Sequence, residues 1–444
     1  MAAEVETHGD AGGAVQSGAV PGESAAWMRL LYIHVVVVSL IAALVVVAWF
    51  ILFEAVTELL WGGTFVTGNA WMFPVICLPF SLAVGLLVKY AKAPSNLDDS
   101  MLDSLTGDVD HIRWKLLPAT IATSLASLWS GAVLGPEGAI GNISSRLAAL
   151  YCDLFRIPSE HRAKLVYASV ASGYNGLLEN PIFAAVLGTE VAGTRQSGLA
   201  VLPANLIGGG VGYGVFHVLH STGFVNFLHL PPVTSYRFVD VVSMVPLGLV
   251  GLVLALLTGL FMKAAGRFFA RLEERVVLRA LVAGAIFSVV GVFAPVMLFS
   301  GETQVQTVIK DAAGYGIALL LVMAVAKLAL LAVGFKGGFL GGPTFPLIFA
   351  STSVALAINL VLPGMPVTIL LAGIMTGALY PLFRTPLMVV LLTGFMLAGD
   401  ATLVALIVLS LATVMIVTPP LQRRMAARQA ARAAGAGQSP GANA

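Results

Sequence analysis

Three acidic side chains stand beside apolar segments, where a carboxylate can take part in ion chemistry. Glu137 lies in Gly135-Pro136-Glu137-Gly138, directly before an apolar run. The start of a helix exposes unpaired N–H groups and a partial positive charge, so it can hold an anion without a full cation. Glu137 can itself be that anion and compete with a solute ion, and its protonation would end the competition. The structural alternative is an acid that is merely stabilised in the first turn of a helix.

The second candidate is the glycine-rich segment from Gly334 to Pro346, which also opens an apolar run. Glycines let backbone N–H groups approach a ligand closely. Thr344 adds a hydroxyl group to this segment. A glycine-rich turn between two helices is the alternative interpretation.

The third candidate is the segment from Gly173 to Glu190, which contains Glu179 and Glu190. Either acid could lie on a proton path, because ionisable residues within membrane segments are rare and usually functional. For Glu190 we favour a structural role, as an acceptor of backbone N–H bonds near the cytoplasmic face.

The elements that hold these residues must cross a membrane. Only 10% of the 444 residues are charged and 58% are hydrophobic, whereas a soluble protein has about 25% charged residues. This chain has too little charge to cover a soluble surface, which excludes most soluble enzymes and nucleic-acid binders. We predict an all-α integral membrane protein that lies in the lipid bilayer of the cell inner (plasma) membrane.

The apolar run from Arg29 to Phe53 is long enough to span a bilayer. Lys and Arg residues gather after the second run and near the end of the chain, and the positive-inside rule then places both termini in the cytoplasm. The predicted divisions are a disordered tail (1–28), a first transmembrane half (29–224), an external linker (225–238), a second transmembrane half (239–422) and a disordered basic tail (423–444).

Several later apolar runs are short or interrupted by Gly or Pro, which is typical of discontinuous helices. The breaks at Gly135–Gly138 and at Gly337–Pro346 fall in different halves of the chain. Paired breaks of this kind point to an inverted repeat with its site near the middle of the membrane.

In their order and spacing, the three segments resemble the CLC family of chloride channels and proton-coupled chloride transporters. Glu137 stands at the position of the family's gating glutamate, and Gly341–Pro346 resembles the family's Gly-x-Phe-x-Pro motif. The resemblance implies a homodimer with many tilted and discontinuous helices, an inverted repeat and one anion pathway per subunit. The anion site that it implies consists of Ser95, Asn96, Gly135, Pro136, Gly138, Ala139, Ile140, Gly342, Pro343, Thr344, Phe345 and Gln422.

The sequence also departs from the family pattern. Ser95 and Asn96 lie at the distance of the family's central serine, but the glycines of that motif are missing. Val191 aligns with the family's inner proton glutamate, and Gln422 aligns with its pore tyrosine. Because Val191 cannot bind a proton, we predict passive or weakly coupled conduction of chloride or another small anion, with Glu179 as the substitute acid.

Two other functions stay open. The chain can be a proton-coupled chloride or fluoride antiporter, which proton movement driven by a chloride gradient would reveal. It can also be an inverted-repeat transporter of another solute class, with Glu137, Glu179 and Glu190 as a cation site and sodium-dependent uptake as its signature. The seven histidines show no metal-ligand spacing, so we expect neither an enzyme nor a cofactor.

Overall fold

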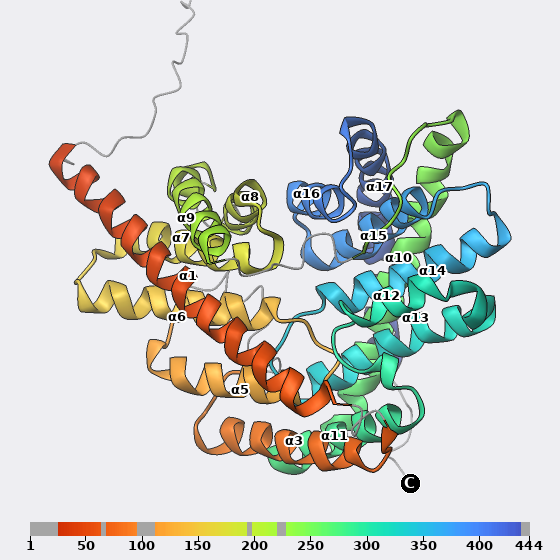
Figure 1. Ribbon diagram of the computed structural model, residues 1–444, viewed down its shortest axis with the longest axis horizontal. Coiled ribbons are helices and arrows are strands. Elements are labelled where there is room, and N and C mark those ends of the chain that lie inside the picture. The colour runs from red at the N-terminus through yellow and green to blue at the C-terminus, as the bar shows by residue number, and fades with distance from the viewer. Residues whose placement is uncertain (1–24, 64–67, 96–111, 193–197, 220–227, 437–444) are drawn as a thin grey trace, which may run out of the picture.

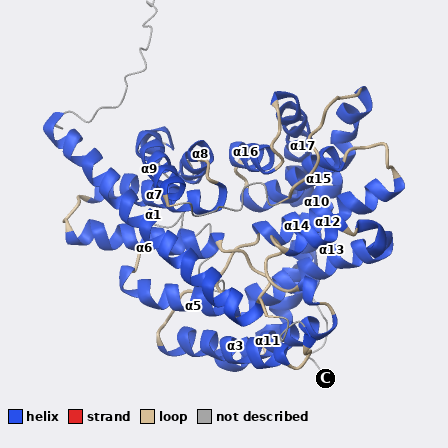
Figure 2. Ribbon diagram, in the orientation of Figure 1, coloured by secondary structure: helices blue, strands red, loops and turns tan. Residues whose placement is uncertain are grey.

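The chain forms helices joined by loops. The computed structural model describes residues 25–63, 68–95, 112–192, 198–219 and 228–436. Within these ranges there is no β-strand (Figure 2), and β-type pairing is limited to one isolated antiparallel bridge between Gly135 and Gly342. The prediction of an all-α protein is therefore confirmed for the part of the chain that is described.

The helices follow one another with short connections. They are α1 (Ala25–Trp61), α3 (Met72–Tyr90), η2 (Trp114–Leu116), α5 (Leu117–Trp129), α6 (Glu137–Leu154), α7 (Ser159–Leu178), α8 (Pro181–Ala192), α9 (Gly198–Val218), α10 (Phe238–Ala270), α11 (Val276–Phe293), η3 (Pro295–Met297), α12 (Gln304–Lys310), α13 (Ala312–Gly337), α14 (Thr344–Val361), α15 (Val367–Phe383), α16 (Pro386–Met396) and α17 (Ala401–Ala436).

Eight of the described helices are long and apolar enough to cross a bilayer. Apart from α14, which is buried over most of its length, they carry exposed apolar side chains along their lengths, such as Ile33, Leu44 and Ile51 on α1. A surface of this kind is stable against lipid and unstable against water. The eight helices are α1, α3, α9, α10, α11, α13, α14 and α17.

The two halves of the chain use the same packing order. In the first half α1 packs on α7 and α9, and α6 packs on α7. In the second half α10 packs on α15 and α17, and α14 packs on α15. Equivalent helices also meet across the molecule, α3 on α11 and α8 on α16 (Figure 1). This pairing matches the repeat architecture that the sequence predicts.

The contact between α10 and α15 depends on a close approach of their backbones. A Cβ atom added to Gly251 would meet the carbonyl oxygen of Ile374 and would come within 2.7 Å of the Ala378 nitrogen. Backbone atoms cannot move aside as a flexible side chain can, so overpacking costs about 1–3 kcal/mol. We expect Gly251→Ala to lower the melting temperature of the purified protein in detergent. The control is Gly259→Ala on the same helix, where no described atom lies within 4 Å of the added Cβ. This variant should have the same melting temperature as the wild type.

Three boundaries differ from the sequence prediction. The basic segment 423–444 was expected to be disordered, but α17 continues through it as far as Ala436. Residues 423–436 consist largely of Ala, Arg, Gln and Met, which are strong helix formers. Helix α1 likewise begins at Ala25, inside the expected tail 1–28. The expected linker 225–238 lies partly outside the described residues, and α10 already begins at its last residue, Phe238.

Candidate anion site

The site begins where the starts of two helices meet in the interior. The N–H of Gly135 donates to the carbonyl of Gly342 at 2.7 Å, and the N–H of Gly342 donates to the carbonyl of Gly135 at 2.7 Å. This pair of bonds joins the loops that lead into α6 and α14. The first turns of both helices, with their free N–H groups and partial positive charge, are thereby brought to one place.

Glycine is required here because the two loops leave no room for side chains. A Cβ atom on Gly138 would lie 2.6 Å from the carbonyl carbon and oxygen of Gly341. Added Cβ atoms on Gly135 and Gly342 would both run into the carboxyl group of Glu137. The glycines therefore open a space between the two loops, and the carboxyl group of Glu137 fills it.

Glu137 is almost fully buried, with 2% of its surface exposed. Its Oε1 accepts a hydrogen bond from the backbone N–H of Thr344, the first residue of α14, at 2.6 Å. Its Oε2 is buried and finds no hydrogen-bond partner among the described residues. The side chain at the start of α6 thus occupies the anion-binding end of α14, which is a position that a small solute anion could take in its place.

Polar side chains hold the backbone around this position. The hydroxyl of Tyr174 donates to the carbonyl of Glu137 at 3.0 Å. The amide of Asn142 donates to the carbonyl of Gly138 at 2.9 Å. The hydroxyl of Ser127 accepts from the N–H of Leu340 at 3.0 Å. These bonds, from side chains of α5, α6 and α7, hold the backbone on both sides of the Glu137 carboxyl group.

A small cavity of about 20 Å³ adjoins Glu137, which is room for about one water molecule. Apart from Glu137, Tyr174 and Thr344, its walls are apolar, with Phe345 among them. Phe345 itself is 2% exposed. An ion or a proton that reaches Glu137 from this side has to cross an apolar constriction.

The residues expected around the two helix starts are all buried at this place. They are Gly135, Pro136, Gly138, Ala139, Ile140, Gly342, Pro343, Thr344 and Phe345. Tyr174 was missed by the sequence analysis, and a tyrosine in an apolar run gives no sign of which carbonyl its hydroxyl will reach.

The third part of the expected site is described only at Ser95. Its side chain is fully buried, and its hydroxyl has no hydrogen-bond partner within the described ranges. Lys92 has a left-handed backbone (φ 52°) just beyond the end of α3, and Ser95 follows in a loop. Asn96 and the helix start expected near it lie outside the described residues. Gln422 belongs to α17, but its side chain is also outside the description.

The two remaining acids have different environments. Glu190 accepts hydrogen bonds from the N–H groups of Leu387 (2.9 Å) and Met388 (2.7 Å) at the start of α16, as the structural interpretation predicts. Glu179 ends α7 with a left-handed backbone (φ 43°) and is half-buried. It directly follows Leu178, which lines the small cavity beside Glu137.

We expect Glu190→Gln to destabilise the protein without changing the pH dependence of anion flux. Glutamine keeps one acceptor oxygen but turns an N–H₂ group toward the second backbone donor, and loss of a helix cap costs about 1 kcal/mol. Thermal unfolding in detergent measures the first effect and flux from liposomes the second. A stable variant with an altered proton dependence would contradict the structural role.

The starts of α6 and α14 face each other around a buried carboxylate, and the chain packs its helices in two similar halves. In a protein with several membrane-spanning helices, this arrangement is typical of ion transport. The model of the family described as voltage gated chloride channel matches residues 80–418. The chain belongs to this family.

The comparisons also find relatives with assigned functions. The H(+)/Cl(-) exchange transporter ClcA from three strains of Vibrio cholerae is 23% identical over 307 residues, which are 66% of this chain and 63% of the relative. The structure of a slow cyanobacterial Cl⁻/H⁺ antiporter is similar with a TM-score of 0.75 at 16% identity, over 89% of this chain and 98% of that chain. A CLC-type fluoride/proton antiporter gives a TM-score of 0.72 at 17% identity, over 90% and 97% of the two chains. Both structures share the all-helical fold of this chain.

Proposed function

We propose that the chain exchanges a small anion, chloride or fluoride, for protons across the membrane, and that Glu137 binds both in turn. The observation that carries the proposal is the hydrogen bond from the N–H of Thr344 to the buried carboxyl group of Glu137. An ionised Glu137 blocks the start of α14. A solute anion that takes its place needs the carboxylate to leave, and a proton on the carboxylate removes the charge that holds it there.

The named relatives support exchange over passive flow. ClcA and both structural neighbours are described as proton-coupled transporters. Proton coupling is the alternative to the passive conduction that Val191 predicts. For this chain the match to ClcA covers less than two thirds of that protein's length, so coupling has to be measured.

Two residues favour passive conduction as a second candidate. Val191 has no proton-binding group, and the carboxylate of neighbouring Glu190 is engaged by two N–H groups of α16. Exchange would then need another acid on the inner side, and Glu179 is our candidate because it directly follows Leu178, which lines the cavity next to Glu137. A cation site formed by Glu137, Glu179 and Glu190 has less support, because Glu137 and Glu190 both face helix N–H donors.

One reconstitution experiment separates these candidates. Liposomes with purified protein are given a chloride gradient, or in parallel a fluoride gradient, and both anion and proton fluxes are recorded. Exchange predicts that protons move against their own gradient when the anion runs down its gradient. Anion flux without proton movement would establish passive conduction, and sodium-dependent uptake without anion flux would establish a transporter of another solute class.

We also propose a homodimer in the plasma membrane, with both termini in the cytoplasm and one anion pathway per subunit. The halves are proposed to divide at 225–238. Ser95, Asn96 and Gln422 are proposed to complete the pathway on its inner side. Chemical crosslinking of the purified protein at increasing dilution tests the dimer, which should persist where chance contacts disappear.

A further inference from the structure

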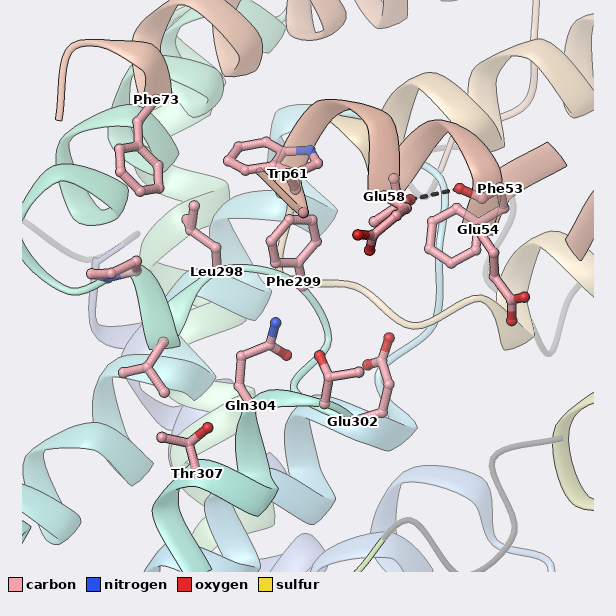
Figure 3. A pocket seen from close by; sticks show the side chains of 15 residues that line it. Phe53, Glu54, Glu58, Trp61, Phe73, Leu298, Phe299, Glu302, Gln304 and Thr307 are labelled. Carbon is pink, nitrogen blue, oxygen red and sulfur yellow. Dashed lines mark hydrogen bonds between the residues drawn. The ribbon is translucent and has the colours of Figure 1, made fainter. Parts of the chain in front are cut away.

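A large pocket lies next to the site. It has a volume of about 690 Å³ and is bounded by the end of α1, the start of α3 and the segment from Pro295 to Thr307. Three carboxylates line it, those of Glu54, Glu58 and Glu302 (Figure 3). Glu54 and Glu58 are exposed, whereas Glu302 is buried at 8% exposure. The topology predicted from the basic loops puts this pocket on the outer side.

A second buried charge lies within electrostatic range of Glu302. The ammonium group of Lys327, which is 0% exposed, donates to the carbonyls of Met297 (3.1 Å), Leu298 (3.0 Å) and Phe299 (2.9 Å). It interacts electrostatically with Glu302, and the hydroxyl of Ser300 also donates to the Glu302 carboxylate. A buried charge is costly unless it is paired, so Lys327 and Glu302 depend on each other.

This pair is joined to the site by short contacts. The N–H of Phe299 donates to the carbonyl of Gly131 at 3.1 Å, four residues before Gly135. The ammonium group of Lys327 lies 4.5 Å from the ring centre of Phe349 on α14, and a Cβ on Gly301 would lie 2.9 Å from that ring. Glu302 and Glu137 are close enough for their carboxylates to repel each other.

We propose that Glu302 is a second proton-binding carboxylate, which takes protons from solution in the outer pocket and sets the charge that an anion meets at Glu137. The inference rests on the proposed anion transport. When a proton forms an O–H bond with the carboxylate of Glu302, the positive charge of Lys327 loses its partner and the repulsion of Glu137 ends. Both changes favour negative charge between α6 and α14, whether Glu137 or a solute anion carries it, so acid in the pocket strengthens the binding of an anion that has taken the place of Glu137.

The other charges that face Glu302 are few. Glu54 and Glu58 come from α1, Lys327 from α13 and Glu137 from α6. Helices α3 and α12 contribute only uncharged side chains to the pocket, and α14 has no ionisable residue. Of the acids, Glu302 alone is both buried beside a lysine and open to the pocket.

The test replaces the carboxylate and follows chloride binding and protonation separately. The comparison is made in Glu137→Gln, where no carboxylate at position 137 competes with chloride. Adding Glu302→Gln to this variant is expected to tighten chloride binding about tenfold at neutral pH and to remove the remaining pH dependence. Adding Glu160→Gln, which replaces an exposed acid on α7, is the matched control and should change neither quantity. Equal affinity and equal pH dependence with and without Glu302→Gln would overturn the proposal.

Infrared difference spectra between acid and neutral pH report protonation without any transport. A carboxylic-acid band should vanish in Glu302→Gln and persist in Glu137→Gln; a band that persists in both overturns the proposal. If Glu302→Gln does not fold, Glu302→Gln with Lys327→Met removes both charges of the pair, and the same band should be absent. If the wild type shows this band but transports no anion, the proposed anion transport is refuted. The proposal that Glu302 binds a proton would not be affected.

Discussion

Replacing Glu137 by Gln is expected to abolish most of the pH dependence of anion flux and to raise the flux at neutral pH. In the wild type the ionised carboxylate accepts the N–H of Thr344 and holds the position of the anion. A hydrogen bond to a charged group contributes about 1.5–3 kcal/mol, so its loss shifts the competition toward the solute anion by about ten- to a hundredfold. Glutamine has nearly the same shape but no charge, and it cannot be titrated.

Chloride and fluoride efflux from liposomes measures this effect over a series of pH values. The wild type should conduct more as the pH falls, because a protonated carboxyl group competes less. Glu137→Gln should keep only the smaller pH dependence that Glu302 contributes and should no longer couple anion flux to protons. Glu160→Gln is the control, because Glu160 is an exposed acid in the first turn of α7. A variant that keeps the wild-type profile would show that Glu137 is a structural acid.

Gly342→Ala is expected to block anion flux at every pH. The added Cβ would fall on the carboxyl carbon of Glu137, so the methyl group would take the space that carboxylate and anion share. The Glu137 side chain is flexible and can move away, but the methyl group stays between the two loops. Unlike a carboxylate, the methyl group cannot be displaced by protonation. We expect the remaining flux to be at most about a tenth of the wild-type flux, since exclusion from the start of α14 removes interactions of more than about 1.4 kcal/mol.

A double variant distinguishes a methyl group that fills the anion site from one that only displaces Glu137. Gly342→Ala combined with Glu137→Ala should stay blocked, because the methyl group remains between the loops. Recovery of flux in the double variant would mean that the methyl group acts only by pressing on Glu137. Gly214→Ala is the control, since an added Cβ at Gly214 meets no atom within 4 Å in the described part of the chain.

The sequence predicts the local features of this protein well. The starts of α6 and α14 fall at the expected breaks, because clustered Gly and Pro residues disfavour a continuous apolar helix there. The repeated halves and the membrane-spanning character follow from the spacing of those breaks and from the low charge.

The pairing of distant residues could not be predicted from one sequence. The bond from Thr344 to Glu137 joins residues 207 positions apart, and the cap of α16 joins Glu190 to residues 197 and 198 positions away. Such pairs depend on how helices pack, which local patterns do not encode. Lys327 could be noticed in the sequence as a single cation in an apolar run. Glu302, which acts on it electrostatically, lies outside that run in the turn before α12. The helix beyond residue 423 was missed because its basic composition was given more weight than its helix propensity.

The most direct test of the account is calorimetric binding of chloride and fluoride to the purified protein at acid and at neutral pH. If Glu137 and the anion compete for the start of α14, the wild type will bind more weakly at neutral pH than at acid pH. Binding to Glu137→Gln will then depend less on pH than binding to the wild type, and at neutral pH this variant will bind the anion more tightly than the wild type. Equal affinities of the wild type and Glu137→Gln at neutral pH, with the same dependence on pH, would contradict the account.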